Sequence, residues 1–359
     1  MKIAKIINTL DFGGIERVFE IYASYYKGAK QNIVFVALGG GGAAEKFIRE
    51  QGYRVIILDD STKIPNIGLI FRLTRLIRKE RPDVVHTCGA EANFHGLLAA
   101  RVCGVKVRIG EEIGIPSHSS VAKTIFRFVF GGASSIIAVA KSVKEYLVVN
   151  KEVDASNVEV IYNPVDVDKF SLNKRNPQNE PFLIVTVCRL HAIKNLKALI
   201  RAFAKVQNKS RHFELWIVGD GPERADLVHL TTTLDVAASV TFWGYQNDPS
   251  AFLSKANLFV LPSFSEGHPV SVIEAMVAEL PVAATKVGGA SEIIEHSVTG
   301  WLIDPNDDDS IVAAIEDVAA LSQERLNSIT SRARRQAMES FSPDSYLSKL
   351  DQLYDRVTV

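Results

Sequence analysis

The stretch NLFVLPSFSEGHPVSVIEAMVAE, residues 257–279, contains the pattern of a strand, a loop and a helix in succession. Residues 258–261 form a short apolar run, typical of a strand buried in a parallel sheet. The following residues, 262–269, include prolines, serines and a glycine and predict a loop. From Val270 onwards apolar side chains recur at helical spacing. Because α/β proteins bind ligands outside the carboxyl ends of their strands, this stretch predicts a ligand site.

Two acidic residues give this predicted site its chemistry. Glu266 lies in the loop and Glu274 lies in the first turns of the helix. A carboxylate can accept two hydrogen bonds from a sugar diol. The first helical turn also offers unpaired backbone N–H groups to a phosphate or a sugar hydroxyl.

The pattern resembles the two-glutamate signature of the retaining glycosyltransferases of the GT-B fold, family four. Other segments of the C-terminal half match that family in the same order and at ordinary spacing. The N-terminal half matches it less closely. The matching segments are VCRLHAIKN (187–195), VGDGPER (218–224), FWGYQND (242–248) and the Gly288-Gly289 turn.

Strand and helix patterns alternate along the whole chain, which favours an α/β fold with parallel, doubly wound sheets. The polar segment 163–181 contains several prolines and is interpreted as the connection between two domains. We therefore expect an N-terminal domain at 1–163 and a C-terminal domain at 164–342. The resemblance implies two Rossmann-like domains that face each other across a cleft, with the last helix, 343–359, crossing back to the first domain.

Arg189 and Lys194 follow the strand predicted at 182–187. A guanidinium makes bidentate contacts with phosphate oxygens, and an ammonium is a small mobile charge. The resemblance assigns both to the diphosphate of a nucleotide sugar, Glu274 to the ribose diol, and Glu266 to the donor sugar. The donor-binding set that it implies is Gly14, Gly219, Tyr245, Glu266, Gly267, His268, Pro269, Val270 and Glu274, in which His268 is an unusual occupant of its position.

The acceptor side is less clearly marked. Members of the family often carry a histidine after the strand predicted at 106–110, where this sequence has Glu111 and Glu112. A carboxylate there could accept a sugar hydroxyl or aid proton transfer, and it could equally be a solvated loop charge. We take Glu112 as a catalytic candidate beside Arg189, Lys194 and Glu266. Three further residues are candidates for the acceptor side: His86, which ends the strand predicted at 83–86 and could equally be structural, Asn93 and His118.

The composition indicates a globular protein without a disulfide framework. The chain has 359 residues and three scattered cysteines, and no apolar run reaches the length of a membrane span. We therefore expect a cytoplasmic protein and no nucleic-acid partner. The zero net charge hides an asymmetry, because residues 1–163 carry 22 basic and 16 acidic side chains, a net charge of +6.

The helix predicted at 67–79 is both basic and amphipathic. Arg72, Arg75 and Lys79 alternate there with apolar residues, so the helix could lie on the anionic inner face of the cytoplasmic membrane. An ordinary solvated charged face is the alternative interpretation.

The function that the resemblance implies is transfer of a sugar, with retention, from a UDP or GDP sugar to a hydroxyl of a glycan or lipid-linked acceptor in surface polysaccharide biosynthesis. We expect no metal and no cofactor, because no Asp-x-Asp motif lies in a credible loop. Two alternatives stay open, a sugar-nucleotide epimerase of the same build and a catalytically silent binding subunit. The run Gly39–Gly42 with Asp59 partly fits a dinucleotide pattern, but an acceptor-side loop is the better interpretation.

Overall fold

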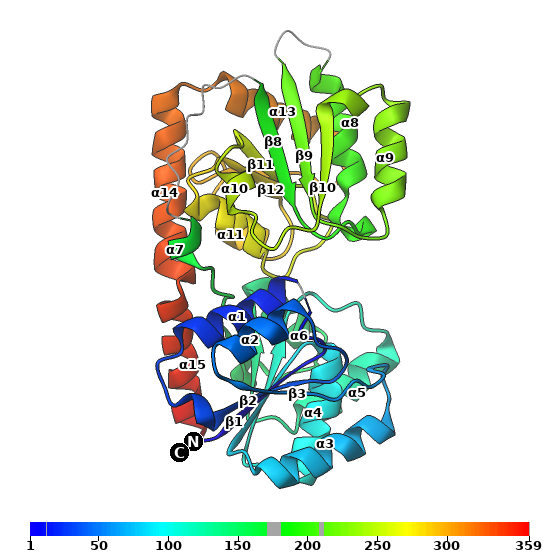
Figure 1. The fold of residues 1–359 in the computed structure, drawn as a ribbon, viewed down its shortest axis with the longest axis vertical. Helices are drawn as coiled ribbons and strands as arrows, with labels where there is room; N and C mark the ends of the chain where they lie inside the picture. The colour runs from blue at the N-terminus through cyan, green and yellow to red at the C-terminus, as the bar shows by residue number, and fades with distance from the viewer. Residues whose placement is uncertain (12, 171–180, 208–211, 359) are drawn as a thin grey trace. The chain divides into compact units, whose positions relative to one another are not determined.

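The structure is a computed structural model that describes residues 1–11, 13–170, 181–207 and 212–358. The chain forms two units (Figure 1). Unit 1 contains Met1–Pro164 together with Pro343–Val359, and unit 2 contains Val165–Ser342. Ten residues of the expected connection, 171–180, lie outside the described residues. Among the described residues, no helix combines the length and the apolar character that a membrane span requires.

Unit 1 is built on a parallel sheet with the strand order β3-β2-β1-β4-β5-β6-β7. Its strands are β1 (Ile3–Ile7), β2 (Ile33–Ala37), β3 (Arg54–Ile57), β4 (Val84–Cys88), β5 (Val107–Glu112), β6 (Ser135–Ala138) and β7 (Val158–Val160). Its helices are α1 (Gly14–Tyr25), α2 (Ala43–Glu50), α3 (Ile67–Glu80), α4 (Ala90–Val102), α5 (Ser120–Phe130), α6 (Lys141–Val149) and α15 (Pro343–Thr358).

Side-chain alternation along β1 shows how both faces of this sheet are covered. Ile3 and Ile7 pack with α1, α2 and α15 on one face. Ala4 and Ile6 pack with α3 and α4 on the other. Apolar side chains on both faces explain why the strand is apolar at every position except Lys5, and does not alternate between apolar and polar residues. The last helix of the chain, α15, therefore completes the core of unit 1.

A buried polar network joins β1, β4 and β5 to α15. The His86 Nδ1 atom lies 2.7 Å from the Tyr354 hydroxyl and 3.1 Å from Lys5 Nζ, and its Nε2 lies 3.0 Å from Glu111 Oε2. Burial lowers the pKa of His86 to about 4 and that of Lys5 to about 8. A neutral imidazole can donate from Nε2 to the Glu111 carboxylate, while Tyr354 and Lys5 share the single lone pair of Nδ1 and Tyr354 makes the shorter contact. The network is thus a hydrogen-bonded link rather than a histidine ion pair.

Unit 2 is built on a second parallel sheet with the order β10-β9-β8-β11-β12-β13. Its strands are β8 (Phe182–Val187), β9 (Phe213–Val218), β10 (Val240–Gly244), β11 (Leu258–Leu261), β12 (Val282–Thr285) and β13 (Trp301–Ile303). Its helices are α7 (Val167–Phe170), α8 (Leu196–Gln207), α9 (Arg224–Thr233), α10 (Ser250–Leu253), α11 (Val270–Val277), α12 (Ala290–Ile293), α13 (Asp308–Ala320) and α14 (Gln323–Phe341).

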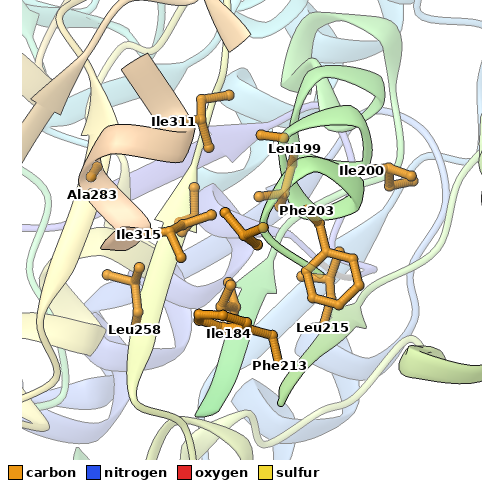
Figure 2. Packing of buried hydrophobic residues seen from close by; sticks show 14 of the residues in the cluster. Ile184, Leu199, Ile200, Phe203, Phe213, Leu215, Leu258, Ala283, Ile311 and Ile315 are labelled. Carbon is orange, nitrogen blue, oxygen red and sulfur yellow. The ribbon is translucent and has the colours of Figure 1, made fainter. Parts of the chain in front are cut away.

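The main core of unit 2 lies between its sheet and the helices α8 and α13. Figure 2 shows Phe203 of α8 and Ile315 of α13 directed toward Ile184, Leu215 and Leu258 of the strands. Connections between parallel strands are right-handed, so the crossover through α11 reverses direction and covers the opposite face. α11 packs there against α14 and α7.

The strand order of unit 2 creates a topological switch point between β8 and β11. From β8 the chain adds β9 and β10 on one side, and then returns to add β11, β12 and β13 on the other. The loops that follow β8 and β11 therefore leave the sheet next to each other and diverge. Such a point is where open α/β sheets bind ligands.

Two strands of unit 1 are longer than the sequence patterns predict, which corrects the expected setting of several candidate residues. β4 continues to Cys88, so His86 lies within the strand and not at its end. β5 continues to Glu112, so Glu111 and Glu112 are strand residues and not loop residues. Patterns that predict buried strands count apolar residues. Polar residues at the ends of these strands, such as Glu111 and Glu112, therefore make the predicted strands too short.

The role of α15 in the core of unit 1 is testable at two neighbouring positions. Leu353 is fully buried in the core, whereas Gln352 is exposed. Replacing Leu353 by Ala should cost about 2–5 kcal/mol of stability, because it leaves a cavity under the helix. The measurement is hydrogen exchange of the β1 and β4 amides, with Gln352→Ala as the matched control. Equal protection in the two variants would contradict this assignment.

Candidate active site

Backbone hydrogen bonds connect the loops at the switch point of unit 2. The N–H of Phe264, after β11, donates to the carbonyl of Ile193, after β8, at 2.8 Å. The N–H of Gly289, after β12, donates to the carbonyl of Glu266 at 3.2 Å. Three loops from neighbouring strands are thereby held in one piece at the carboxyl edge of the sheet. This rigidity is what a binding site needs for precise placement of its side chains.

Lys194 and Glu266 form an ion pair across the switch point. Lys194 Nζ lies 2.7 Å from Glu266 Oε1, and the hydroxyl of Ser263 donates to the same oxygen at 2.5 Å. Glu266 and Ser263 are buried, whereas the Lys194 side chain keeps a partial exposure of 22%. The hydroxyl of Thr285 in turn donates to the Ser263 carbonyl at 2.5 Å. Hydrogen bonds therefore fix the carboxylate in place, and Lys194 is the more exposed member of the pair.

The local backbone places Lys194 beside this carboxylate. Lys194 ends a 3₁₀ turn, Ala192–Lys194, and Asn195 follows in the left-handed region with φ 54°. The Asn195 amide donates to the carbonyl of Pro305 at 2.8 Å, which stabilises that conformation. α8 starts immediately afterwards at Leu196. Arg189 lies in the same loop, five residues earlier, and its side chain is exposed.

Close backbone approach requires glycine at two positions of these loops. A Cβ on Gly219, whose φ is +137°, would lie 1.9 Å from the carbonyl oxygen of Cys188. A Cβ on Gly289 would lie 2.0 Å from the carbonyl oxygen of Gly267. In both cases the neighbouring atom belongs to backbone, so the clash cannot be relieved by a side-chain rotation. The loop after β9 and the turn after β12 can therefore approach the switch point only with glycine.

The remaining donor-site candidates of unit 2 lie on α11 and in the segments that follow β10 and β11. His268, Pro269 and Val270 are buried at the start of α11, and Glu274 is buried one turn later in the same helix. The His268 ring packs on Phe341 with a centroid distance of 5.1 Å, and burial lowers the pKa of His268 to about 3. This histidine is therefore neutral at physiological pH. Gly267 is half-buried in the loop, and Tyr245 is exposed just after β10.

In unit 1, Glu112 is a buried carboxyl at the carboxyl end of β5. Its Oε2 atom has no hydrogen-bond partner in the part of the chain that the structure describes. Burial, reinforced by the nearby carboxylates of Glu152 and Glu91, raises the pKa of Glu112 to about 8. The group is therefore largely protonated at neutral pH, so it can donate a hydrogen bond as well as accept one.

His118 lies just before α5 and is mostly buried. Its Nδ1 lies 2.9 Å from Glu152 Oε2, and its ring stacks on Phe126 with a centroid distance of 4.3 Å. Burial raises the pKa of Glu152, and the second oxygen of this carboxyl, Oε1, has no partner among the described residues. Glu152 thus contacts His118 directly, and its charge also helps to raise the pKa of Glu112.

The structure assigns structural roles to two of the expected acceptor-side residues. His86 is 1% exposed, and both of its ring nitrogens bond within unit 1, which favours the structural alternative for this residue. Asn93 is fully buried, and its amide donates to the Glu111 carbonyl at 2.9 Å. Both side chains hold β5 in place instead. Sequence reasoning missed these structural roles because it ended the predicted strands before the true ends of β4 and β5.

The glycine-rich segments of unit 1 differ in their surroundings. Gly14 is the first residue of α1, and a Cβ there would meet nothing within 4 Å, so packing alone does not require this glycine. The run Gly39–Gly42 pairs with the loop after β1, because the Leu10 N–H donates to the Gly40 carbonyl at 3.1 Å. The expected acceptor-side loop therefore has a defined backbone pairing.

Sequence reasoning missed several residues that shape these sites. Ser263 lies three residues before Glu266, and this spacing could have indicated a serine that orients the carboxylate. Thr285 and Glu152 carry no such local signal, because only tertiary packing brings them to the sites. Across residues 1–11, 13–170, 181–207 and 212–358, no cluster of three or more His, Cys, Asp or Glu side chains is arranged to hold a metal ion.

Family comparisons match both units. A family model described as "Glycosyltransferase Family 4" matches residues 12–169, and one described as "Glycosyl transferases group 1" matches residues 167–336. Together they span nearly the whole chain. The chain belongs to glycosyltransferase family 4. Its fold, with two parallel-sheet Rossmann-like units, is the one that GT-B glycosyltransferases share.

Individual relatives agree with this membership. This glycosyltransferase is 27% identical over 338 residues to the Escherichia coli UDP-Gal:alpha-D-GlcNAc-diphosphoundecaprenol alpha-1,3-galactosyltransferase, covering 85% of this chain and 87% of that protein. It is 23% identical over 350 residues to the Staphylococcus aureus capsular polysaccharide biosynthesis glycosyltransferase CapM, covering 91% and 90% of the two chains. The crystal structure of Anabaena Alr3699/HepE with UDP-glucose superposes with a TM-score of 0.85 at 20% identity, covering 99% of this chain and 100% of the other. Neither the epimerase nor the silent subunit is favoured by these matches.

The close approach at Gly289 provides a test of the loop assembly in the glycosyltransferase. Gly289→Ala should displace the loop that carries Glu266, because the new Cβ meets the Gly267 carbonyl, while its φ of −63° accepts alanine. We expect loss of sugar transfer on the order of tenfold or more, as for other small displacements of catalytic groups. Ser291→Ala, an exposed neighbour, is the matched control. Full activity of Gly289→Ala would show that the contact does not position the site.

The titration of Glu112 provides a second test. The unfolded chain ionises this carboxyl from about pH 4.5, whereas the folded chain keeps its proton up to a pKa of about 8. The folded state therefore binds more protons in that window, and stability falls as the pH rises from about 4.5 to about 8. Glu112→Gln should remove this loss, so the variant should gain stability over the parent as the pH rises. Hydrogen exchange of the β5 amides measures the difference, with the exposed Glu145→Gln as the charge control. A difference that does not change with pH would contradict the assigned protonation.

Proposed function

We propose that this glycosyltransferase transfers a sugar, with retention of the anomeric configuration and without a metal ion, from a UDP sugar to a hydroxyl of a lipid-linked glycan. The observation that carries the proposal is the Lys194–Glu266 pair at the switch point of unit 2, which presents a cation beside a fixed carboxylate. The names of the relatives support the donor and acceptor classes. One is named for UDP-Gal and a diphosphoundecaprenol acceptor, one for capsular polysaccharide, and one was solved with UDP-glucose.

In the proposed reaction the bond between C1 of the donor sugar and the β-phosphate oxygen breaks, and C1 bonds to the acceptor oxygen on the same face. The acceptor proton passes to the departing diphosphate. Lys194 and Arg189 would stabilise the charge that develops on that diphosphate, which is the work that a metal ion performs in other transferases. Each charge-assisted contact of this kind contributes roughly 1.5–3 kcal/mol.

The other parts of the nucleotide sugar would contact α11 and the remaining loops of unit 2. Glu274, buried on α11, would accept the ribose hydroxyls, and the backbone around exposed Tyr245 would face the base. Glu266 and the backbone of 267–270 would contact the sugar. Gly219 would let backbone approach the phosphates, and the family resemblance suggests the same role for Gly14.

For the acceptor side we propose Glu112 and His118. The Oε2 atom of Glu112 has no partner among the described residues, and this largely protonated carboxyl could donate to a sugar oxygen or take part in proton transfer. His118 is linked to the same environment through Glu152. This proposal no longer includes His86 and Asn93, which the structure uses to hold β5.

A lipid-linked acceptor would bring the enzyme to the inner face of the cytoplasmic membrane, so we propose peripheral contact through α3. Arg75 and Lys79 are exposed on this helix. The guanidinium of Arg72, the third expected residue, is bonded to Asp60 at 2.7 Å and to the Leu58 carbonyl at 2.7 Å. Arg72 therefore contributes charge but has fewer donors left for lipid.

The test of the reaction is release of free nucleotide diphosphate from a panel of UDP-, GDP- and ADP-sugars with a lipid-linked glycan acceptor and a chelator present. One donor should react in the presence of chelator, and Lys194→Ala should lower its rate by roughly ten- to more than a hundredfold. Lys205→Ala, an exposed lysine on α8 that pairs with Asp309, is the matched control. NMR of the product gives the anomeric configuration.

Several outcomes would contradict the proposal. Loss of the reaction in chelator that added metal restores would reject metal independence. An inverted product would reject retention. Conversion of the donor to an isomer without an acceptor would indicate an epimerase, and tight donor binding without turnover would indicate a silent subunit. Because all three tryptophans lie in unit 2, their fluorescence shows whether Lys194→Ala leaves that unit folded.

A further inference from the structure

We propose that α3 and α5 together form a membrane-binding face in which aromatic and aliphatic side chains enter an anionic lipid surface. We call this surface the α3–α5 face and define it by Ile67, Phe71, Val121, Ile125 and Phe128. It deepens the proposed function, because a contact through the cations of α3 alone would leave these apolar side chains unexplained. Its physical basis, however, is independent of the reaction.

Large apolar side chains are unusually exposed on both helices. Ile67 and Phe71 on α3 are 80% and 69% exposed, and they lie four residues apart on one stripe of the helix. Val121 and Phe128 on α5 are 70% and 62% exposed, with Ile125 between them on the same stripe. Single exposed apolar residues are ordinary on protein surfaces. A repeated stripe on two helices of the same layer is a feature of interaction surfaces.

The two stripes belong to one surface of unit 1. α4 lies between α3 and α5 and packs against both (Figure 1), and the middle of α4 is buried. Ile70 of α3 contacts both the core under α3 and α4 and the core that contains α5. At the far end, the Arg101 guanidinium of α4 lies over the Phe128 ring at 5.1 Å. The outer sides of α3 and α5 therefore flank α4 on the same face of the sheet.

The charge of this face identifies its partner. α3, α4 and α5 carry seven Lys or Arg residues and only two acidic residues, Glu80 and Glu91. Glu80 is buried and neutralised by Lys2 and Arg54, at 3.1 and 2.8 Å. From Ile113 to Lys144, a range that includes all of α5, the sequence has no acidic residue. A face with apolar stripes and an excess of cations complements an anionic bilayer, which offers both acyl chains and negative headgroups.

The arrangement of the cations supports insertion rather than simple adsorption. Arg75 follows Phe71 by one helical turn, and Arg127 is adjacent to Phe128. Long basic side chains beside aromatic anchors can reach headgroup phosphates while the rings enter the interface. Apolar and electrostatic contributions should therefore both be measurable and separable.

The test is flotation of the full-length protein with vesicles of phosphatidylcholine alone and vesicles with phosphatidylglycerol added. The parent should float only with the anionic vesicles, and added salt should weaken its binding. The double variant Phe71→Ser/Phe128→Ser should lower the partition coefficient on the order of a hundredfold, because two aromatic anchors are removed. Arg75→Gln/Arg127→Gln should lower it about tenfold and reduce the salt dependence.

The matched control is Val149→Ser/Val228→Ser, which removes two exposed valines on α6 and α9, outside the α3–α5 face. Its binding should equal that of the parent. No flotation of the parent, equal binding to neutral vesicles, or equal loss in the control variant would overturn the proposal. A stable complex with a protein partner and no vesicle binding would overturn it in the same way.

Activity on a water-soluble acceptor separates this inference from the proposed reaction. The serine variants should keep their turnover with such an acceptor, because the altered side chains lie on the outer faces of α3 and α5. Vesicle binding without any sugar transfer would leave the α3–α5 face intact and reject the proposed reaction. Sugar transfer without vesicle binding would support the proposed reaction and reject the α3–α5 face as a membrane-binding surface.

Discussion

The candidate donor site depends on one ion pair, Lys194 with Glu266, formed where β8 and β11 lie side by side. The reversal of strand order in unit 2 brings their two loops together, although the residues are far apart in the sequence. Ser263 and Thr285 then fix the carboxylate, and glycines at 219 and 289 let the flanking loops approach. A partly buried pair held this firmly is organised before any substrate arrives, which is the condition for electrostatic catalysis.

In unit 1, two neighbouring buried carboxyl groups have different surroundings. Glu111 and Glu112 are neighbours on β5 and point to opposite faces of the sheet, as strand geometry requires. Glu111 is committed to the network of Lys5, His86 and Tyr354, which joins the sheet to α15. The Oε2 atom of Glu112 has no hydrogen-bond partner among the residues that the structure describes, and burial raises the pKa of this carboxyl to about 8. One carboxyl is thus fixed by hydrogen bonds within unit 1, whereas the other is largely protonated at neutral pH.

The sequence predicts the fold class and the family well, because apolar runs, loop residues and family motifs are all local patterns. The strand Leu258–Leu261, the start of α11 at Val270 and the placement of Glu266 follow from them directly. The roles of His86 and Asn93 did not follow, because polar residues lengthen β4 and β5 and make these strands look shorter than they are. Partners such as Thr285, Glu152 and Tyr354 depend on tertiary packing, so no local pattern indicates them.

The most direct test of the central claim is the affinity of the protein for UDP and for uridine, measured by calorimetry in the parent and in Lys194→Ala. If Lys194 binds the diphosphate, the parent should prefer UDP strongly, and the variant should lose roughly ten- to a hundredfold of that preference while its uridine affinity stays the same. An unchanged preference for UDP in the variant, or an equal loss of affinity for both ligands, would contradict the account.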